Sequence, residues 1–216
     1  MFDRIAGRYD RANSLMTLGQ DSLWRRRAAR AAIDGHPASS VLDCACGTGK
    51  LASAVLRAGA LRVVGLDFSE RMVEIARDGH PGIKFMTGDV LHLPFADGAF
   101  DAATIGFGLR NLHDPIAGLR EMARVVRPGG RIAVLEAVRP EGPLAPIADL
   151  LATWGPRMAG AVIGEPAAYR YLTESVRAFA TAPELGSWFV RAGIAKGPVT
   201  RMGLGSVALA VGTVPG

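Results

Sequence analysis

Three aspartates and two glycines have the types and spacing that suit the binding of a charged nucleoside. Asp43 precedes a turn that contains Gly47 and Gly49, and Asp67 and Asp89 each follow a short apolar run. Glycine lets the backbone approach a ligand that a Cβ atom would push away, and a carboxylate accepts hydrogen bonds from hydroxyl and amine groups. The pattern predicts a nucleoside site built from the ends of several strands.

Two classes of ligand compete for this site. Residues 47–52 satisfy the relaxed dinucleotide pattern, so NAD remains a possible ligand. ATP is excluded, because the segment lacks the distal glycine that a phosphate-binding loop requires. A carboxylate at Asp43 would repel a pyrophosphate but would attract the ammonium and sulfonium groups of S-adenosylmethionine. We therefore expect S-adenosylmethionine as cofactor, with Asp67 accepting the ribose hydroxyls and Asp89 the adenine amine. A purely structural role remains the alternative for each acid.

Alternating β-branched and helical runs position these residues in a parallel, doubly wound α/β sheet. Ser69, and Asp114 followed by Pro115, are predicted to cap two helices. A turn is expected at 127–130, and a closing hairpin at 198–202 and 206–214. The predicted strands are 40–47, 62–68, 83–89, 100–108 and 131–138, and the predicted helices are 51–59, 71–79, 115–126 and 183–194.

The length of 216 residues and the 49% apolar content predict a single domain over residues 1–216. Residues 1–38 and 140–182 lie outside the α/β pattern, and we expect an N-terminal helical cap and a helical insertion that forms a substrate wall. One face of that insertion is either core packing or a groove for a prenyl tail. The face consists of Leu144, Ile147, Leu150, Leu151 and Trp154.

The charge balance is weakly basic, with 25 Lys and Arg against 20 Asp and Glu. The cluster at Arg25, Arg26, Arg27 and Arg30 is either a solvated helix face or a contact with anionic lipid, and we expect no nucleic-acid partner. We expect neither a signal peptide nor a membrane span, so the cytoplasm is the predicted location. Two nearby cysteines, at positions 44 and 46, are predicted to be small buried residues without a disulfide or a metal.

Several segments give this chain a family resemblance. GFGLRN and YRYLTES are the most discriminating, and together the segments resemble, in order and over almost the whole chain, the ubiquinone/menaquinone C-methyltransferases. The resemblance implies transfer of a methyl group to a ring carbon of a polyprenyl quinol such as demethylmenaquinol. It implies the class I S-adenosylmethionine-dependent methyltransferase fold, a Rossmann-like α/β fold with a seven-stranded, mostly parallel sheet and a C-terminal antiparallel strand. The segments are MFDRIAGRYDRAN, LGQDSLWRRRA, VLDCACGTG, LPFADGAFDAATIGFGLRN, LREMARVVRPGG and AYRYLTESVRAF.

The resemblance places donor contacts on Thr48, Asp67, the pair Asp89-Val90, and Gly106. The chain departs from the family at Gly106, where serine is common, at Lys50, where aspartate is common, and in its last strand, which lacks a histidine. Lys50 and the altered last strand favour the alternative of a small-molecule methyltransferase with another acceptor. A donor-binding accessory protein is a further alternative. The whole predicted donor site is Asp43, Gly47, Thr48, Gly49, Asp67, Phe68, Asp89, Val90 and Gly106.

Catalysis on a ring carbon requires an ionised hydroxyl, which costs roughly 4 kcal/mol at neutral pH for a phenol of pKa about 10. Arg110 is predicted to stabilise the phenolate, or else to pair with a nearby carboxylate. Asn111 would orient a water or the second quinol oxygen. Tyr9 would close over the donor or hydrogen-bond the acceptor, or else anchor its own segment. His113 is a candidate general base, but its place directly before the Asp114 cap favours a surface position on the loop. The chemistry needs no metal. Contact with the membrane periphery and a homodimer are further expectations.

Overall fold

The computed structural model describes residues 17, 19–34, 39–142, 145–148 and 173–216. Tyr9 lies outside the described residues. The same holds for Leu144, Leu150, Leu151 and Trp154 of the insertion.

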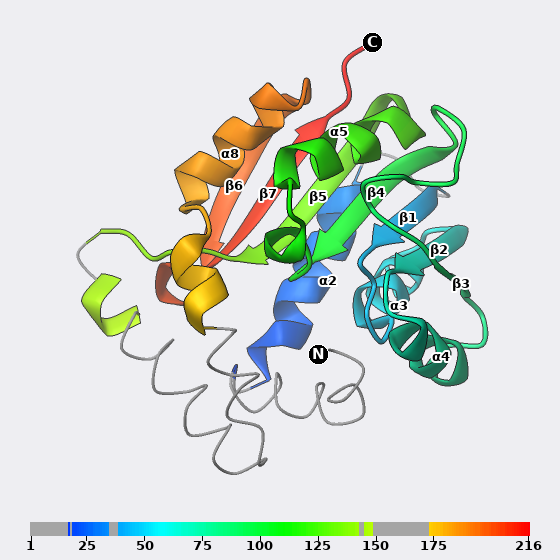
Figure 1. Ribbon diagram of the computed structural model, residues 1–216, viewed down its shortest axis with the longest axis horizontal. Coiled ribbons are helices and arrows are strands. Elements are labelled where there is room, and N and C mark those ends of the chain that lie inside the picture. The colour runs from blue at the N-terminus through cyan, green and yellow to red at the C-terminus, as the bar shows by residue number, and fades with distance from the viewer. Residues whose placement is uncertain (1–16, 18, 35–38, 143–144, 149–172) are drawn as a thin grey trace.

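Seven strands form one sheet in the order β3-β2-β1-β4-β5-β7-β6 (Figure 1). The first five strands along the chain pair in parallel, and β7 runs antiparallel to both of its neighbours, β5 and β6. The predicted fold class is therefore confirmed, including the closing hairpin. The strands are β1 (Ser40–Cys44), β2 (Arg62–Asp67), β3 (Lys84–Thr87), β4 (Phe100–Gly106), β5 (Val126–Ala137), β6 (Ala195–Met202) and β7 (Val207–Thr213).

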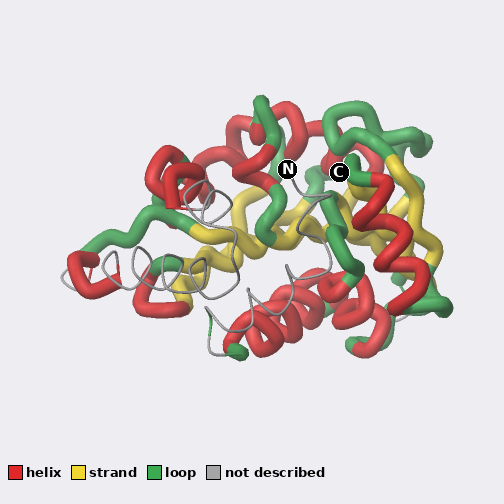
Figure 2. Tube along the Cα trace, turned by 60° about the horizontal axis from the view of Figure 1, so that its bottom comes forward, coloured by secondary structure: helices red, strands yellow, loops and turns green. Residues whose placement is uncertain are grey.

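Helices cover both faces of this sheet, which Figure 2 shows as red layers on either side of the yellow strands. One apolar cluster joins the sheet to α2 (Gln20–Ile33), α3 (Lys50–Arg57) and α4 (Glu70–Gly79). A second cluster joins the opposite face to α5 (Pro115–Val125) and α8 (Ala182–Arg191). Central strands with both faces covered need apolar residues at successive positions, which explains their runs of buried residues.

Both predicted helix caps are confirmed. The Ser69 hydroxyl accepts a hydrogen bond from the Met72 amide (3.2 Å) at the start of α4. Asp114 Oδ1 accepts from the amides of Ile116 (3.0 Å) and Ala117 (2.9 Å) ahead of α5. These acceptors satisfy amides that the first helical turn leaves unpaired.

The predicted turn at 127–130 is part of β5 rather than a separate link before it. Val126 pairs with Phe100 and Arg131 pairs with Ala102, so four residues of β5 bulge opposite the single residue Asp101. The Arg127 Nε donates to Asp101 Oδ1 across the bulge (2.6 Å). Pairing on both sides of the turn makes the strand longer than the sequence pattern indicates.

The strand order places a topological switch point between β1 and β4. The chain moves from β1 outward to β2 and β3, then returns to the other side of β1 to form β4. Loops after β1 and β4 therefore diverge and leave space at the carboxyl edge of the sheet, where doubly wound folds bind ligands. None of the helices in the described part of the chain has the length and apolarity that crossing a bilayer requires.

Candidate active site

The turn after β1 has the backbone geometry that the glycine pattern predicts. Gly47 and Gly49 adopt positive φ angles of 54° and 81°, in the left-handed region that favours glycine. A Cβ atom on Gly49 would lie 2.7 Å from Phe85 Cζ, so this position also lacks room for a side chain. The turn leads directly into α3.

Asp67 ties this turn to the end of β2. Its Oδ2 accepts a hydrogen bond from the Gly47 amide (2.7 Å), and its Oδ1 accepts from the Ser69 amide (2.9 Å). A carboxylate can accept several hydrogen bonds, including those of the two hydroxyls of a ribose. The residue thus orders the turn and lines the space beside it.

Asp89 lies beyond the end of β3 as an ionised acceptor. The Leu91 amide donates to its Oδ1 (2.9 Å), and this hydrogen bond lowers the pKa of the carboxyl below its usual value. His92 Nδ1 lies 3.3 Å from Asp89 Oδ2. A charged carboxylate here suits an amine donor such as that of adenine.

Asp43 is the buried acid of the site. Its Oδ1 accepts from the Thr104 hydroxyl (2.7 Å), and its Oδ2 is buried without a hydrogen-bond partner among the described residues. Burial raises the pKa of Asp43 from 3.8 to about 7, although the Thr104 hydrogen bond, the Ala52 amide and the charge of Arg25 oppose that rise. A buried carboxylate with one unpaired oxygen fits a ligand that brings its own cation, as the ammonium of S-adenosylmethionine does.

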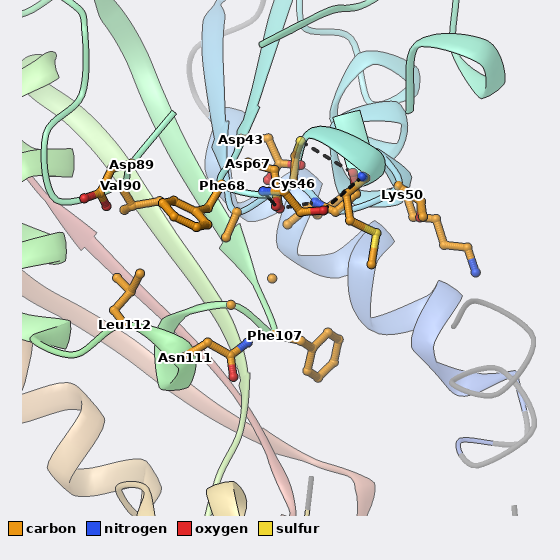
Figure 3. Close-up of a pocket in the computed structure, with 18 of the residues that line it drawn as sticks. Asp43, Cys46, Lys50, Asp67, Phe68, Asp89, Val90, Phe107, Asn111 and Leu112 are labelled. Carbon is orange, nitrogen blue, oxygen red and sulfur yellow. Dashed lines mark hydrogen bonds between the residues drawn. The ribbon is translucent and has the colours of Figure 1, made fainter. Parts of the chain in front are cut away.

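A cavity of about 350 Å³ joins these acids. Figure 3 shows Asp43, Asp67 and Asp89 on one side, with Phe107, Asn111 and Leu112 opposite them. This volume falls within the range of small-molecule and cofactor pockets. Predicted site residues that line the cavity are Asp43, Gly47, Thr48, Asp67, Phe68, Asp89, Val90, Gly106 and Asn111.

Gly106, where the family commonly has serine, ends β4 at the cavity. A Cβ atom there would lie 2.9 Å from Leu51 Cδ2, so the absence of a side chain at this position allows Leu51 to pack closely. Gly49 is not part of the cavity lining, because it packs against Phe85 behind the turn. Its role is to shape the turn.

Arg110 is not among the described residues that line the cavity, so its direct contact with a phenolate stays a prediction. Its side chain is 4% exposed and pairs with the fully buried Glu136 of β5 (Nη1 to Oε1, 2.5 Å). The same Nη1 donates to the Phe107 carbonyl (2.8 Å), and the Arg110 amide donates to Glu136 Oε2 (3.2 Å). This geometry matches the alternative that the sequence left open, an arginine paired with a nearby carboxylate.

The Arg110–Glu136 pair shapes the loop that presents Asn111. The loop contains Phe107, which has a left-handed φ of 59°, and the short 3₁₀ helix η1 (Leu109–Asn111). Because Arg110 bonds both Glu136 and the Phe107 carbonyl, it joins this unusual backbone to the end of β5. Asn111 then lines the cavity from the end of the loop.

Sequence reasoning missed several cavity residues. Arg25 was assigned to an exposed arginine cluster, although its i,i+4 spacing from Asp21 was a signal that its side chain is held to the helix. His113 is exposed, as expected, yet it also lines the cavity. The other missed residues are Ala45, Cys46, Leu51, Ser69, Met72, Leu91, Phe107, Gly108 and Leu112.

Both cysteines are buried and free, as the sequence predicts. Burial raises the pKa of each thiol well above its usual value, which favours the uncharged thiol. They contribute apolar volume beneath the turn rather than nucleophiles.

The sequence profile of the ubiE/COQ5 methyltransferase family matches residues 1–214. The chain belongs to this family. Its cofactor is accordingly S-adenosylmethionine, and it is an enzyme that transfers methyl groups.

Curated relatives of similar length support this assignment. A demethylmenaquinone methyltransferase from Streptomyces avermitilis is 43% identical over 97% of this chain and 90% of its own length. Two further proteins of the same name are similar. The one from Beutenbergia cavernae is 48% identical and covers 82% of this chain and 74% of its own length. The one from Clavibacter sepedonicus is 40% identical and covers 100% of this chain and 89% of its own length.

Solved structures agree at the level of the fold. A methyltransferase in complex with the Trm112 activator of Haloferax volcanii superposes with a TM-score of 0.72 at 20% identity, covering 100% of this chain and 98% of that one. An S-adenosylmethionine-dependent methyltransferase from Thermotoga maritima gives 0.69 at 21% identity, covering 98% and 97%. These similarities concern the architecture alone.

Proposed function

We propose that this chain transfers the methyl group of S-adenosylmethionine to a ring carbon of demethylmenaquinol. The support comes from the demethylmenaquinone methyltransferases that it resembles over nearly their whole length. The observation that carries the donor half is one cavity that contains Asp43, Asp67 and Asp89 beside a glycine turn. Bound S-adenosylmethionine supplies a methyl group on a positively charged sulfur.

In this proposal, each donor-binding residue contacts a different part of S-adenosylmethionine. Asp89 and Val90 take the adenine, Asp67 takes the ribose hydroxyls, and Asp43 takes the ammonium. Gly47, Thr48, Phe68 and Gly106 complete the walls of this half of the cavity.

The acceptor half lies on the side of Asn111. Its amide is suited to orient a quinol oxygen or a water that receives the proton of the ring hydroxyl. Arg110 acts in this proposal as a positioning residue, through Glu136 and the Phe107 carbonyl. His113 is a second candidate for the proton acceptor, because its side chain lines the same cavity. Tyr9 keeps its predicted role next to the donor or acceptor.

The direct test is transfer of labelled methyl from S-adenosylmethionine to chemically reduced, short-chain demethylmenaquinone. We expect label in the ring of the naphthoquinol product, and a loss of about 10²-fold or more in kcat for Asn111→Ala with the donor Kd retained, because the amide acts on the acceptor. A demethylated benzoquinol serves as the comparison acceptor. Donor binding without transfer to the naphthoquinol would contradict the proposed substrate, and transfer to the benzoquinol alone would replace it.

Three finer expectations also remain proposals: contact with the periphery of the membrane, a homodimer, and a cytoplasmic location. Arg26, Arg27 and Arg30 are exposed on α2, which supports attraction to an anionic lipid surface. The division into an N-terminal cap over 1–38 and a substrate wall over 140–182 is likewise a prediction.

A further inference from the structure

One arginine of α2 differs from its neighbours because it enters the donor cavity. Arg26, Arg27 and Arg30 are exposed, whereas the side chain of Arg25 is only 11% exposed and lines the cavity. Its guanidinium carbon lies 5.3 Å from the centre of the Phe107 ring, at the end of β4. Arg25 is thus a cation facing a cavity that otherwise contains several acids.

Asp21 holds this guanidinium in place. Arg25 Nη1 donates to Asp21 Oδ2 (2.5 Å), and Asp21 Oδ1 accepts from the Thr17 hydroxyl (3.3 Å). Asp21 is the only residue with which Arg25 makes a hydrogen bond within the described part of the chain. Because a guanidinium carries five N–H donors, this anchoring leaves donors for a ligand.

The strand order determines which end of the donor lies near Arg25. Asp89 follows β3, Asp67 ends β2 and Asp43 lies in β1; these strands are successive in the sheet, and β4 comes next. The covalent order of the donor is adenine, ribose, and then the amino-acid chain that ends in an ammonium and a carboxylate. With the adenine at Asp89 and the ribose at Asp67, that amino-acid end lies toward β1 and β4.

Arg25 and Asp43 are within electrostatic reach of each other at this end. The charge of Arg25 lowers the pKa of Asp43, so the two groups share one environment. One offers a cation and the other an anion, which matches the carboxylate and the ammonium of an amino acid.

We propose that Arg25 binds the carboxylate of the amino-acid end of S-adenosylmethionine, and that Asp21 positions it. The planar fork of arginine suits a carboxylate, which it can bind with two parallel hydrogen bonds. Lys50 is the alternative cation at the cavity, but in Figure 3 its side chain extends away from the three acids. This inference rests on the donor half of the proposed function and is independent of the acceptor.

Calorimetric titration with two ligands tests the proposal without any quinol. S-adenosylmethionine and decarboxylated S-adenosylmethionine differ only in the carboxylate. We expect Arg25→Gln to weaken S-adenosylmethionine binding by about 10- to 100-fold, because a charge-assisted hydrogen bond is lost. The decarboxylated ligand should lose much less affinity, because for this ligand only the effect of the Arg25 charge on Asp43 disappears. Arg26→Gln, on the exposed side of the same helix, is the matched control and should change neither affinity.

Arg25→Lys keeps the positive charge but loses the planar guanidinium. Its preference for the carboxylated ligand should lie between those of the wild type and Arg25→Gln. If Arg25→Gln does not fold, the lysine variant tests the proposal by the same quantity, the ratio of its affinities for the carboxylated and decarboxylated ligands. Equal losses for both ligands would assign Arg25 a structural role and overturn the proposal. Unchanged donor affinity with a raised KM for the quinol would place Arg25 on the acceptor instead, which also overturns it.

Discussion

Asp43 carries the most consequential chemistry of any single residue in the cavity. It is buried, one of its oxygens has no partner within the described residues, and its pKa is raised to about 7. A carboxyl in this state is partly protonated at neutral pH and gains most from a ligand cation. Donor binding and proton release are therefore coupled at this residue.

We expect the affinity for S-adenosylhomocysteine to rise by up to about tenfold per pH unit as the pH increases toward 7, and then to level off. Below its pKa, Asp43 must lose a proton before it can bind the ammonium. Asp43→Asn should bind more weakly at pH 7 and lose this slope in calorimetric titrations. A slope that persists in Asp43→Asn would assign the titration to a group other than Asp43.

The stability of the ligand-free protein should have the opposite dependence on pH. The pKa of Asp43 is about 7 in the folded state against an ordinary value of 3.8, so folding is favoured when this group is protonated. Its contribution to the free energy of unfolding is therefore present below pH 4 and is lost as the pH rises from about 4 to about 7. Urea unfolding of the wild type and of Asp43→Asn across that range measures the difference.

At the scale of elements, the pair between Arg110 and Glu136 joins η1 to β5. Both side chains are almost fully buried, so each charge depends on the other. Removal of one partner from a buried pair costs about 3–5 kcal/mol, whereas replacement of both by apolar residues is often neutral. The pair thus links stability to the conformation of the loop that carries Asn111.

We expect Glu136→Gln to lower the free energy of unfolding by about 3 kcal/mol, because it leaves the Arg110 charge buried without its counter-charge. The double variant Arg110→Met/Glu136→Leu should recover most of that loss in urea unfolding. Both variants should have a reduced kcat with a nearly unchanged donor Kd, since neither residue lines the cavity.

The matched control is Glu74→Gln, which breaks the exposed pair between Arg71 and Glu74. It should cost no more than about 1 kcal/mol, because solvent screens exposed pairs. Wild-type stability of Glu136→Gln would mean that Arg110 obtains another partner on folding.

At the scale of the whole molecule, the donor site uses only one half of the sheet. The cavity is lined by the carboxyl ends of β1, β2 and β4, by the loops after β1 to β4, and by residues of α2, α3 and α4. Strands β6 and β7 contribute none of its described lining residues. Ligand binding should therefore suppress local unfolding mainly at the carboxyl ends of the four strands β1 to β4.

Native-state hydrogen exchange with and without S-adenosylhomocysteine tests this division. At a ligand concentration of 100 times the Kd, exchange that requires loss of the site should slow by about 100-fold. We expect this slowing at amides of residues 45–49, 67–69 and 89–91. Locally exchanging amides of the hairpin formed by β6 and β7 should keep their rates. Equal slowing there would show that the two halves of the sheet open as one unit.

Local patterns in the sequence were sufficient for the fold and for most of the donor site. Period-two and period-3.6 patterns, two helix caps and the glycine turn depend on neighbours along the chain, and the structure confirms each of them. Asp43, Asp67 and Asp89 could be placed together because parallel strands end at one edge of a sheet.

Only the tertiary structure decided the environment of the two arginines. Arg110 pairs with Glu136, which is 26 positions away in sequence, and Arg25 faces a cavity formed by β1 and β4. Burial and ion pairing depend on which strands become neighbours, and sequence spacing does not contain that information. The sequence by itself therefore determined the family, the fold and the three acids that line the cavity, whereas packing between distant segments determined where the side chains of Arg25 and Arg110 lie.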